Sequence, residues 1–323
     1  MSSPSLPNEY AVELTPPDIA PYAAGNAGVP YVWTFEAGTP GPHAMITAIV
    51  HGNEPCGAIA LDWLLSQDFR PTRGSLTLAF MNVEAYEAFD PDDPNATRWV
   101  DEDMNRVWAP EVLASDRDSV ELRRARAVQP IVASADRLLD IHSMQHLAPP
   151  VTIAGTRAKG VALSAAIGVP PIVIVDAGHA AGVRMRDHGA FDDPESDAAA
   201  ALIECGQHWE AAAGILAKEA TARFLISQEM GGEELLASLD LPEPPNQTFW
   251  EVTNPVTIED EFRFAEPFTG GEVLAEPGYL LGWDGEREVR TDYANCMLVM
   301  PSKRLWKGQT AVRLARQVTN PPI

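Results

Sequence analysis

Three residues with metal-binding side chains stand where apolar segments of the chain end. His51 and Glu54 follow the apolar run 44–50 and precede a segment, 55–65, whose pattern predicts a helix. His142 follows a second apolar run, 138–141. Two histidines and one carboxylate match the three protein ligands of a catalytic zinc site, which keeps its fourth position for water. A His and a Glu three residues apart also arise by chance, and a single His at a strand end is more often structural.

A second group of reactive side chains lies between residues 98 and 106. Arg98, Asn105 and Arg106 fall in a Pro- and Asp-rich stretch without periodicity, so we expect a loop. Guanidinium groups pair with carboxylates through two parallel hydrogen bonds and can stabilise an oxyanion. The alternative is a set of surface ion pairs with the acidic residues 101–103 of the same stretch.

Glu204 provides the third candidate motif. It follows an apolar stretch and precedes Gly206, again at the end of a predicted strand. A carboxylate that faces an activated water can take its proton and pass it to a leaving nitrogen. An ordinary, partly buried glutamate in an ion pair is the alternative that the sequence leaves open.

Taken together and in this order, the motifs resemble a known enzyme family. The chain has His51-Gly-Asn-Glu54, then Arg98 through Asn105-Arg106, then Asp140-Ile-His142, then Glu204-Cys-Gly206. This series resembles the succinylglutamate desuccinylase/aspartoacylase family, a group of zinc-carboxypeptidase-like amide hydrolases. Each motif is weak singly, but four in order are specific, and together they span roughly residues 44 to 207.

The resemblance implies a catalytic centre with one Zn²⁺ per chain. His51, Glu54 and His142 would be the zinc ligands. Glu204 would act as general base and then general acid, while Arg98 would polarise the scissile carbonyl and hold the developing oxyanion. The implied activity is hydrolysis of the acyl–nitrogen bond of an N-acylated amino acid or a related small amide.

The resemblance implies two further residues that hold the substrate and one that supports the metal, and a tyrosine of the C-terminal part is a separate candidate. Asn105 and Arg106 would bind a substrate carboxylate or the polar end of the acyl group. Tyr293, from the C-terminal part, would reach the site as a hydrogen-bond donor, with an exposed turn as the equally weighted alternative. Asp140 lies two residues before His142, so on a strand both share one face and the carboxylate could orient the imidazole.

The chain departs from the family pattern shortly before the catalytic glutamate. Family members place an additional arginine there for a second substrate carboxylate, whereas residues 192–198 here are acidic and contain no arginine. Arg184 or Arg186 would have to replace it. An acidic wall would repel a dianionic substrate, so an N-acyl derivative of a diamino acid is the expectation from charge.

Alternating strand and helix patterns predict an α/β fold. Apolar runs at 31–36, 44–50, 75–82, 137–141, 151–153 and 171–175 predict strands, and 55–65, 115–135, 160–167 and 207–224 predict helices. Residues 197–205 are expected to pass from an alanine-rich helix into a short strand. Nearly continuous apolar strands indicate a mostly parallel or mixed sheet flanked by helices.

The pattern changes after the proline-rich segment 241–245. Short strand-like runs follow at 249–256, 261–264, 273–274, 279–283, 296–300 and 311–314. We therefore expect a catalytic domain at 1–240 and a smaller C-terminal β domain at 241–323 that shapes the substrate entrance.

Composition and net charge argue against several classes of binding partner. The formal net charge of −23 argues against nucleic acid or an anionic membrane surface as a partner, and no apolar run is long enough to span a membrane. Three scattered cysteines and an N-terminus without signal-peptide character favour a cytoplasmic protein. A small amide is the expected partner, and a homo-oligomer is left open.

Two other functions remain open at this stage. A metallocarboxypeptidase that trims short peptides would use the same metal centre and the same recognition of a carboxylate by Arg106. A non-catalytic binding protein on this scaffold is the alternative from another class. The presence of Glu204 argues against it, because a metal site without chemistry does not need a base.

Overall fold

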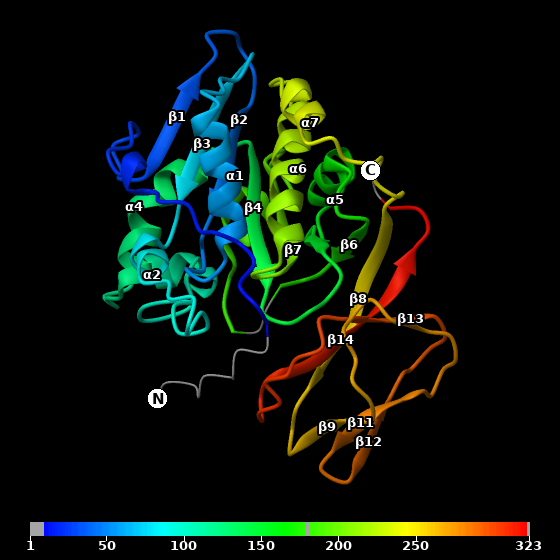
Figure 1. The fold of residues 1–323 in the computed structure, drawn as a ribbon. Coiled ribbons are helices and arrows are strands. Elements are labelled where there is room, and N and C mark those ends of the chain that lie inside the picture. Colours follow the sequence, from blue (N-terminus) through cyan, green and yellow to red (C-terminus); the bar gives the residue numbers. More distant parts are fainter. Residues whose placement is uncertain (1–9, 179–180, 322–323) are drawn as a thin grey trace.

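The fold is built on one large mixed sheet. The computed structural model describes residues 10–178 and 181–321 (Figure 1). Eleven strands follow the order β1-β3-β2-β4-β7-β5-β6-β8-β14-β13-β10. Their bounds are β1 Val32–Glu36, β2 His43–Ala48, β3 Ser75–Phe80, β4 Arg137–Met144, β5 Val151–Ile153, β6 Ile172–Val175, β7 Ala199–Gln207, β8 Thr248–Thr257, β10 Val273–Leu274, β13 Cys296–Val299 and β14 Thr310–Val318. The predicted α/β class is confirmed.

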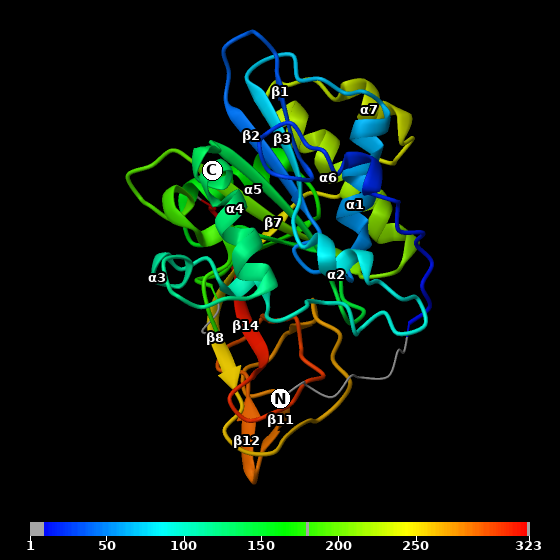
Figure 2. The same cartoon turned by 90° about the vertical axis from the view of Figure 1, so that its left-hand side faces the viewer.

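Helices cover both faces of the sheet. Their bounds are α1 Pro55–Ser66, α2 Val83–Glu87, α3 Pro110–Leu113, α4 Val120–Ser134, α5 Ala158–Ile167, α6 Ala211–Ser227 and α7 Glu233–Ser238. Seen along the sheet edge, α1 and α6 lie on one side and α4 on the other (Figure 2). Alternate residues of β2 enter the two cores: Ile46 packs in the core that holds α1, and Met45 in the core that holds α4. This burial on both faces explains why the central strands are apolar without a break.

Parallel pairing of the central strands brings the candidate residues together. β3, β2, β4 and β7 run parallel to one another, so their carboxyl ends meet at one edge. His142 on β4 and Glu204 on β7 are direct register partners. The loop after β2 carries His51 to the same edge.

The C-terminal strands extend this sheet. β8 pairs in parallel with β6, and β14, β13 and β10 then add antiparallel strands (Figure 1). A separate three-stranded sheet forms from β9 Phe262–Phe264, β11 Leu280–Asp284 and β12 Arg287–Arg290. The C-terminal region is therefore rich in antiparallel strands, as expected. The domain division at residues 240 and 241 stays a prediction, since the hydrogen-bonded sheet continues across it.

One predicted element is wrong, and others were missed. Residues 197–205 do not begin with an alanine-rich helix: β7 is a single strand, and Ala199, Ala200 and Ala201 are buried within it. Alanine favours helices intrinsically, but small side chains also suit a central strand on which helices pack closely, and tertiary packing decides. The short elements α2, α7 and β12 carry patterns too brief to identify.

None of the helices described is long and apolar enough to cross a membrane.

Candidate metal centre and substrate pockets

The turn between β2 and α1 is shaped to present two ligands. Glu54 occupies the position just before α1, and Pro55 begins the helix, where its missing N–H and fixed φ are favourable. A Cβ at Gly52 would lie only 2.4 Å from the backbone of Ala85 and 2.5 Å from the carbonyl oxygen of Thr97. Only glycine fits this close approach, which fixes the path of the chain between His51 and Glu54.

His51, Glu54 and His142 converge on one point. One ligand atom from each lies within 4.8 Å of the others, and all three residues are buried. The Nδ1 atom of His51 is 2.8 Å from Glu54 Oε1, and the Nδ1 atom of His142 is 2.9 Å from Glu54 Oε2. The two imidazoles therefore face the same carboxylate through their Nδ1 atoms.

The outer nitrogens of both imidazoles reach other carboxylates. His51 Nε2 lies 2.9 Å from Asp103 Oδ1, and His142 Nε2 lies 3.0 Å from Asp140 Oδ2. An imidazole that donates its Nε2–H outward keeps the Nδ1 lone pair available for a metal, a common arrangement around zinc. The donor set thus fits a divalent cation. The orienting position predicted for Asp140 corresponds to this contact.

Charge within the cluster is consistent with a cation site. Burial raises the pKa of the Glu54 carboxyl, whereas the neighbouring His51 and His142 side chains lower it. The lowering effect is the larger in sum, and the pKa of Glu54 lies well below its usual range. Glu54 is therefore an anion, as a metal ligand must be.

Arg98 approaches the cluster from the loop after α2. Its Nη1 donates to Glu54 Oε1 at 3.0 Å, and its Nη2 lies 3.0 Å from His51 Nε2 and 3.8 Å from Asp103 Oδ2. The backbone N–H of Gly52 donates to the Arg98 carbonyl oxygen at 3.0 Å, which ties this loop to the ligand turn. The segment from 98 to 106 is the predicted loop, ending in a short 3₁₀ turn at Met104–Arg106.

A fully buried carboxylate anchors the same loop. Glu121, on α4, accepts the backbone N–H groups of Val100, Asp101 and Glu102 at 2.7 to 3.2 Å. It also accepts the side-chain amide of Asn82 at 3.0 Å. Four donors on one carboxylate fix the loop between Arg98 and Asp103.

Glu204 lies beside the cluster with one oxygen unsatisfied. Its Oε2 atom is buried and has no hydrogen-bond partner among the described residues. Burial raises the pKa of this carboxyl to about 8, against the lowering effect of His142. A buried acceptor without a partner is rare in folded proteins and marks a place for a ligand, water or ion.

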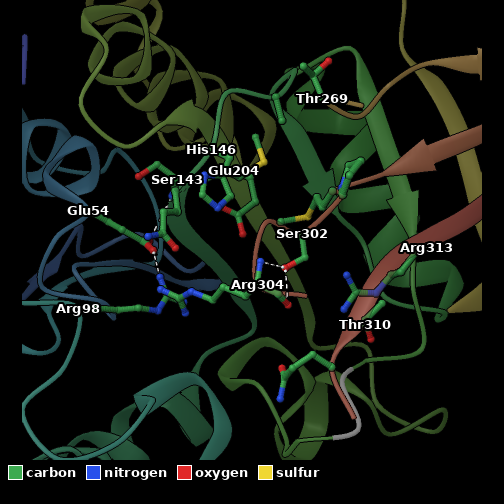
Figure 3. A pocket seen from close by; sticks show the side chains of 16 residues that line it. Glu54, Arg98, Ser143, His146, Glu204, Thr269, Ser302, Arg304, Thr310 and Arg313 are labelled. Carbon is green, nitrogen blue, oxygen red and sulfur yellow. Dashed lines mark hydrogen bonds and ion pairs between the residues drawn. The ribbon is translucent and has the colours of Figure 1, made fainter. Parts of the chain in front are cut away.

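Two neighbouring cavities meet at Arg98 and Glu204. The first, of about 190 Å³, is called the arginine pocket here because its wall includes Arg98, Arg106, Arg184 and Arg313. Its remaining lining is His51, Asn105, His142, Ile153, Ile174, Asp176, Leu202, Glu204, Val299 and Met300. The second, of about 240 Å³, is called the adjacent pocket (Figure 3). It shares Arg98, Glu204, Met300 and Arg313 with the arginine pocket and is bordered by Glu54, Ser143 and Arg304.

The structure brings most of the predicted substrate residues to these cavities. Asn105 and Arg106 line the arginine pocket, and Asn105 Oδ1 also accepts the backbone N–H of Met185. Tyr293 lines neither cavity. Its hydroxyl hydrogen-bonds with Thr253 at 2.6 Å, and Arg316 stacks on its ring.

The acidic segment 192–198 does not form a wall of either cavity. Asp192 is exposed and pairs with Arg157. The expectation of an acidic pocket is therefore wrong, because sequence proximity to Glu204 does not place this loop beside it. Of the two arginines considered as replacements, Arg184 lines the arginine pocket, whereas Arg186 is buried against the backbone carbonyl groups of Ala154 and Ala200.

Sequence reasoning missed several residues of the site. Asp103 lies inside the recognised motif, so its contact with His51 could have been sought there. Glu121, Arg304 and Arg313 stand outside any motif and carry no local signal. They reach the site only because α4 and the strands after residue 245 pack against it.

Comparisons with known proteins identify the family and the fold. A family model described as the succinylglutamate desuccinylase/aspartoacylase catalytic domain matches residues 40–227. A comparison with curated protein sequences gives no match.

Solved structures share the fold. Succinylglutamate desuccinylase from Vibrio cholerae superposes with a TM-score of 0.63 at 16% identity, covering 90% of this chain and 86% of that chain. The ectoine utilization protein EutE (DoeB) from Ruegeria pomeroyi gives 0.60 at 17% identity, covering 89% and 88%. Murine aminoacylase 3 gives 0.58 at 16% identity, covering 86% and 96%. At these low sequence identities, the structural similarity establishes the fold alone.

Proposed function

Because the chain belongs to the succinylglutamate desuccinylase/aspartoacylase family, we propose that it is a zinc-dependent amidohydrolase that removes the acyl group from an N-acylated amino acid. One observation carries this proposal. Three ligand atoms from His51, Glu54 and His142 lie within 4.8 Å of one another, next to the unsatisfied Oε2 of Glu204. The match to structures of a desuccinylase and an aminoacylase supports the same class of reaction.

Zinc is the metal that best suits these donors. Two imidazole nitrogens and one carboxylate are a common ligand set of catalytic zinc sites, which leave a position open. Zinc supplies Lewis acidity, lowering the pKa of water and polarising carbonyl groups. The carboxylates of Asp103 and Asp140 hold the two imidazoles with their Nδ1 atoms facing inward.

Two side chains would carry the proton and the negative charge. Glu204 would accept a proton from the attacking water at Oε2 and return it to the leaving nitrogen. Its raised pKa suits this exchange, since a base and acid works best near the operating pH. Arg98, already held by Glu54 and Asp103, would donate to the carbonyl oxygen as that atom gains negative charge.

The arginine pocket would hold the rest of the substrate. Arg106 would bind the α-carboxylate that every N-acyl amino acid carries, and Asn105 would offer its side-chain amide beside it. Arg106 donates only to a backbone carbonyl and forms no ion pair among the described residues, so its charge is available.

The test is hydrolysis of a panel of N-acyl amino acids by zinc-loaded protein. We expect the wild type to release free amino acid, and Glu204→Gln to keep its zinc by elemental analysis but lose turnover by about 10²- to 10⁴-fold. Glu36→Gln, at an exposed position on β1, serves as the control and should match the wild type.

The same assay separates the alternatives. Faster cleavage of dipeptides than of N-acyl amino acids would indicate a carboxypeptidase instead. Absence of hydrolysis across a broad amide panel, with zinc bound, would favour a binding protein and refute the proposal.

A further inference from the structure

A fully buried imidazole is joined to the metal cluster through one serine and has no part in the mechanism proposed above. His208 comes directly after the end of β7 and is 0% exposed. Its Nδ1 atom is 2.8 Å from the hydroxyl oxygen of Ser143 on β4, and its Nε2 atom has no hydrogen-bond partner among the described residues. Burial lowers the pKa of this ring to about 3, so the ring is neutral and does not repel a bound cation.

A bulge in β7 brings His208 to this position. Over the two residues of β4 that follow His142, β7 advances by three residues and ends at Gln207. Gly206 lies in this longer stretch with a φ of 110°, a conformation that glycine adopts at little cost. The backbone N–H of His208 then donates to the carbonyl oxygen of Met144 at 2.9 Å. Bulges beside active sites commonly redirect a side chain, and this one places an imidazole against β4.

Ser143 lies where the strand pairing of β4 is interrupted. Pairing with β2 ends at Asp140, and pairing with β7 shifts immediately before Met144, so Ser143 has no register partner in either of these strands. Its backbone N–H is directed instead to Glu54 Oε2, at 3.2 Å. Because the sheet does not fix this peptide, the contact between the Ser143 hydroxyl and His208 is what restrains it.

The buried ring costs stability that an apolar side chain would not. A buried polar atom without a hydrogen bond is unfavourable, and a leucine of similar volume at position 208 would avoid that cost. Residues that break such a rule are typical of functional sites, where the benefit appears in the site and not in the fold. Here the nearest functional group is the Glu54 carboxylate, which the Ser143 N–H contacts.

We propose that His208 is a positioning residue that, by holding Ser143, keeps the Ser143 N–H on Glu54 Oε2 and so fixes the orientation in which Glu54 binds zinc. Arg98 donates to the other oxygen, Oε1, at 3.0 Å, so the two donors together restrict rotation of the carboxylate (Figure 3). Partners that orient a metal ligand typically change metal affinity by about 10- to 100-fold. This inference rests on the zinc site of the proposed function and not on the identity of the substrate.

Zinc affinity, measured by competition with a chelator, tests the inference. Ser143→Ala removes the hydroxyl and keeps the backbone N–H, whereas His208→Leu removes the ring nitrogen at similar volume. We expect each variant to weaken zinc binding about tenfold or more. His208→Asn, whose side-chain amide can occupy the place of Nδ1, should retain most of the affinity. Wild-type affinity in both Ser143→Ala and His208→Leu would overturn the inference.

The double variant Ser143→Ala/His208→Leu distinguishes positioning from ordinary packing. Both substitutions break the same contact, so the double variant should bind zinc no more weakly than the weaker-binding single variant. Its free energy of unfolding without metal should equal or exceed that of the wild type, because both partners of the hydrogen bond have been replaced by apolar groups. Losses of affinity that add in the double variant would show that the two residues act separately, and the inference would be wrong.

His188→Leu serves as the matched control. His188 is also buried, and its Nδ1 atom lies 2.8 Å from the carbonyl oxygen of Trp108, outside the metal cluster. This variant should lower the free energy of unfolding and leave zinc affinity unchanged. If His208→Leu behaves in the same way, the ring of His208 has only a structural role, contrary to the inference.

Zinc binding also keeps this inference separate from the proposed function. If the zinc-loaded wild type hydrolyses no amide, the proposed function fails, and the affinities of the variants still decide the role of His208. A wild type that binds no zinc would refute both.

Discussion

Removing the charge of Glu204 should stabilise the metal-free protein in a pH-dependent way. Glu204 has a pKa of about 8 in the folded protein, raised chiefly by burial, whereas its ordinary value is 4.5. Below pH 4.5 the carboxyl is protonated in both folded and unfolded chains. Between 4.5 and 8 the unfolded chain loses the proton and the folded chain keeps it, so stability falls as pH rises.

The magnitude follows from the width of that window. Each pH unit within it lowers the free energy of unfolding by about 1.4 kcal/mol, on the order of 5 kcal/mol across the whole range. Glutamine has nearly the same shape and no charge. The Glu204→Gln protein should therefore not show this fall in the free energy of unfolding as pH rises. The stability of Glu204→Gln relative to wild type should therefore grow from pH 5 to 8 and level off above 8.

Urea denaturation of protein treated with a chelator measures this difference. Wild type, Glu204→Gln and the exposed control Glu36→Gln are compared at intervals from pH 5 to 9. A cation beside a carboxylate lowers its pKa, so saturation with zinc should shrink the difference. A stability difference that stays constant from pH 5 to 8 would show that Glu204 is not held protonated, and the account of its burial would be wrong.

Three further substitutions test separate parts of the site. Arg98→Ala should lower kcat by about 10²- to 10³-fold with zinc content unchanged by elemental analysis, because one donor to the oxyanion is lost; near wild-type activity would refute its role. Asp140→Asn should weaken zinc binding about 10- to 100-fold in a chelator competition, since His142 loses its orienting carboxylate, and unchanged affinity would contradict that reading. Glu121→Gln should destabilise the fold by about 2–4 kcal/mol in urea denaturation, because an amide cannot accept all four hydrogen bonds at this buried position. A change under about 0.5 kcal/mol would show that these hydrogen bonds do not hold the loop.

Local sequence patterns predicted the centre of the molecule well, for a physical reason. Strands buried on both faces must be continuously apolar, and polar residues at their ends then stand out, as His142 and Glu204 do. Parallel pairing gathers such ends at one edge, so the metal cluster followed from the order of the motifs alone. Asn105 and Arg106 lie in a loop and a short 3₁₀ turn, and they were found through the resemblance to the family motif.

Long-range packing determines the parts of the fold and of the site that the sequence did not predict. Which side chains from the C-terminal strands reach the cavity depends on how β8 docks on β6, and no local pattern encodes that. Arg313 was missed for this reason, and the acidic segment 192–198 was misplaced by assuming that neighbours of Glu204 in sequence are neighbours in space. The alanine run in β7 misled because helix propensity is weaker than the demands of packing at a sheet centre.

The central claim is that one zinc ion is held by two imidazoles and one carboxylate. Crystals of the protein grown with zinc, measured at the zinc absorption edge, test it most directly. We expect a single anomalous peak about 2.0–2.2 Å from His51 Nδ1, His142 Nδ1 and a Glu54 oxygen, with Glu204 facing the open side. A peak elsewhere, or coordination through the Nε2 atoms, would contradict it.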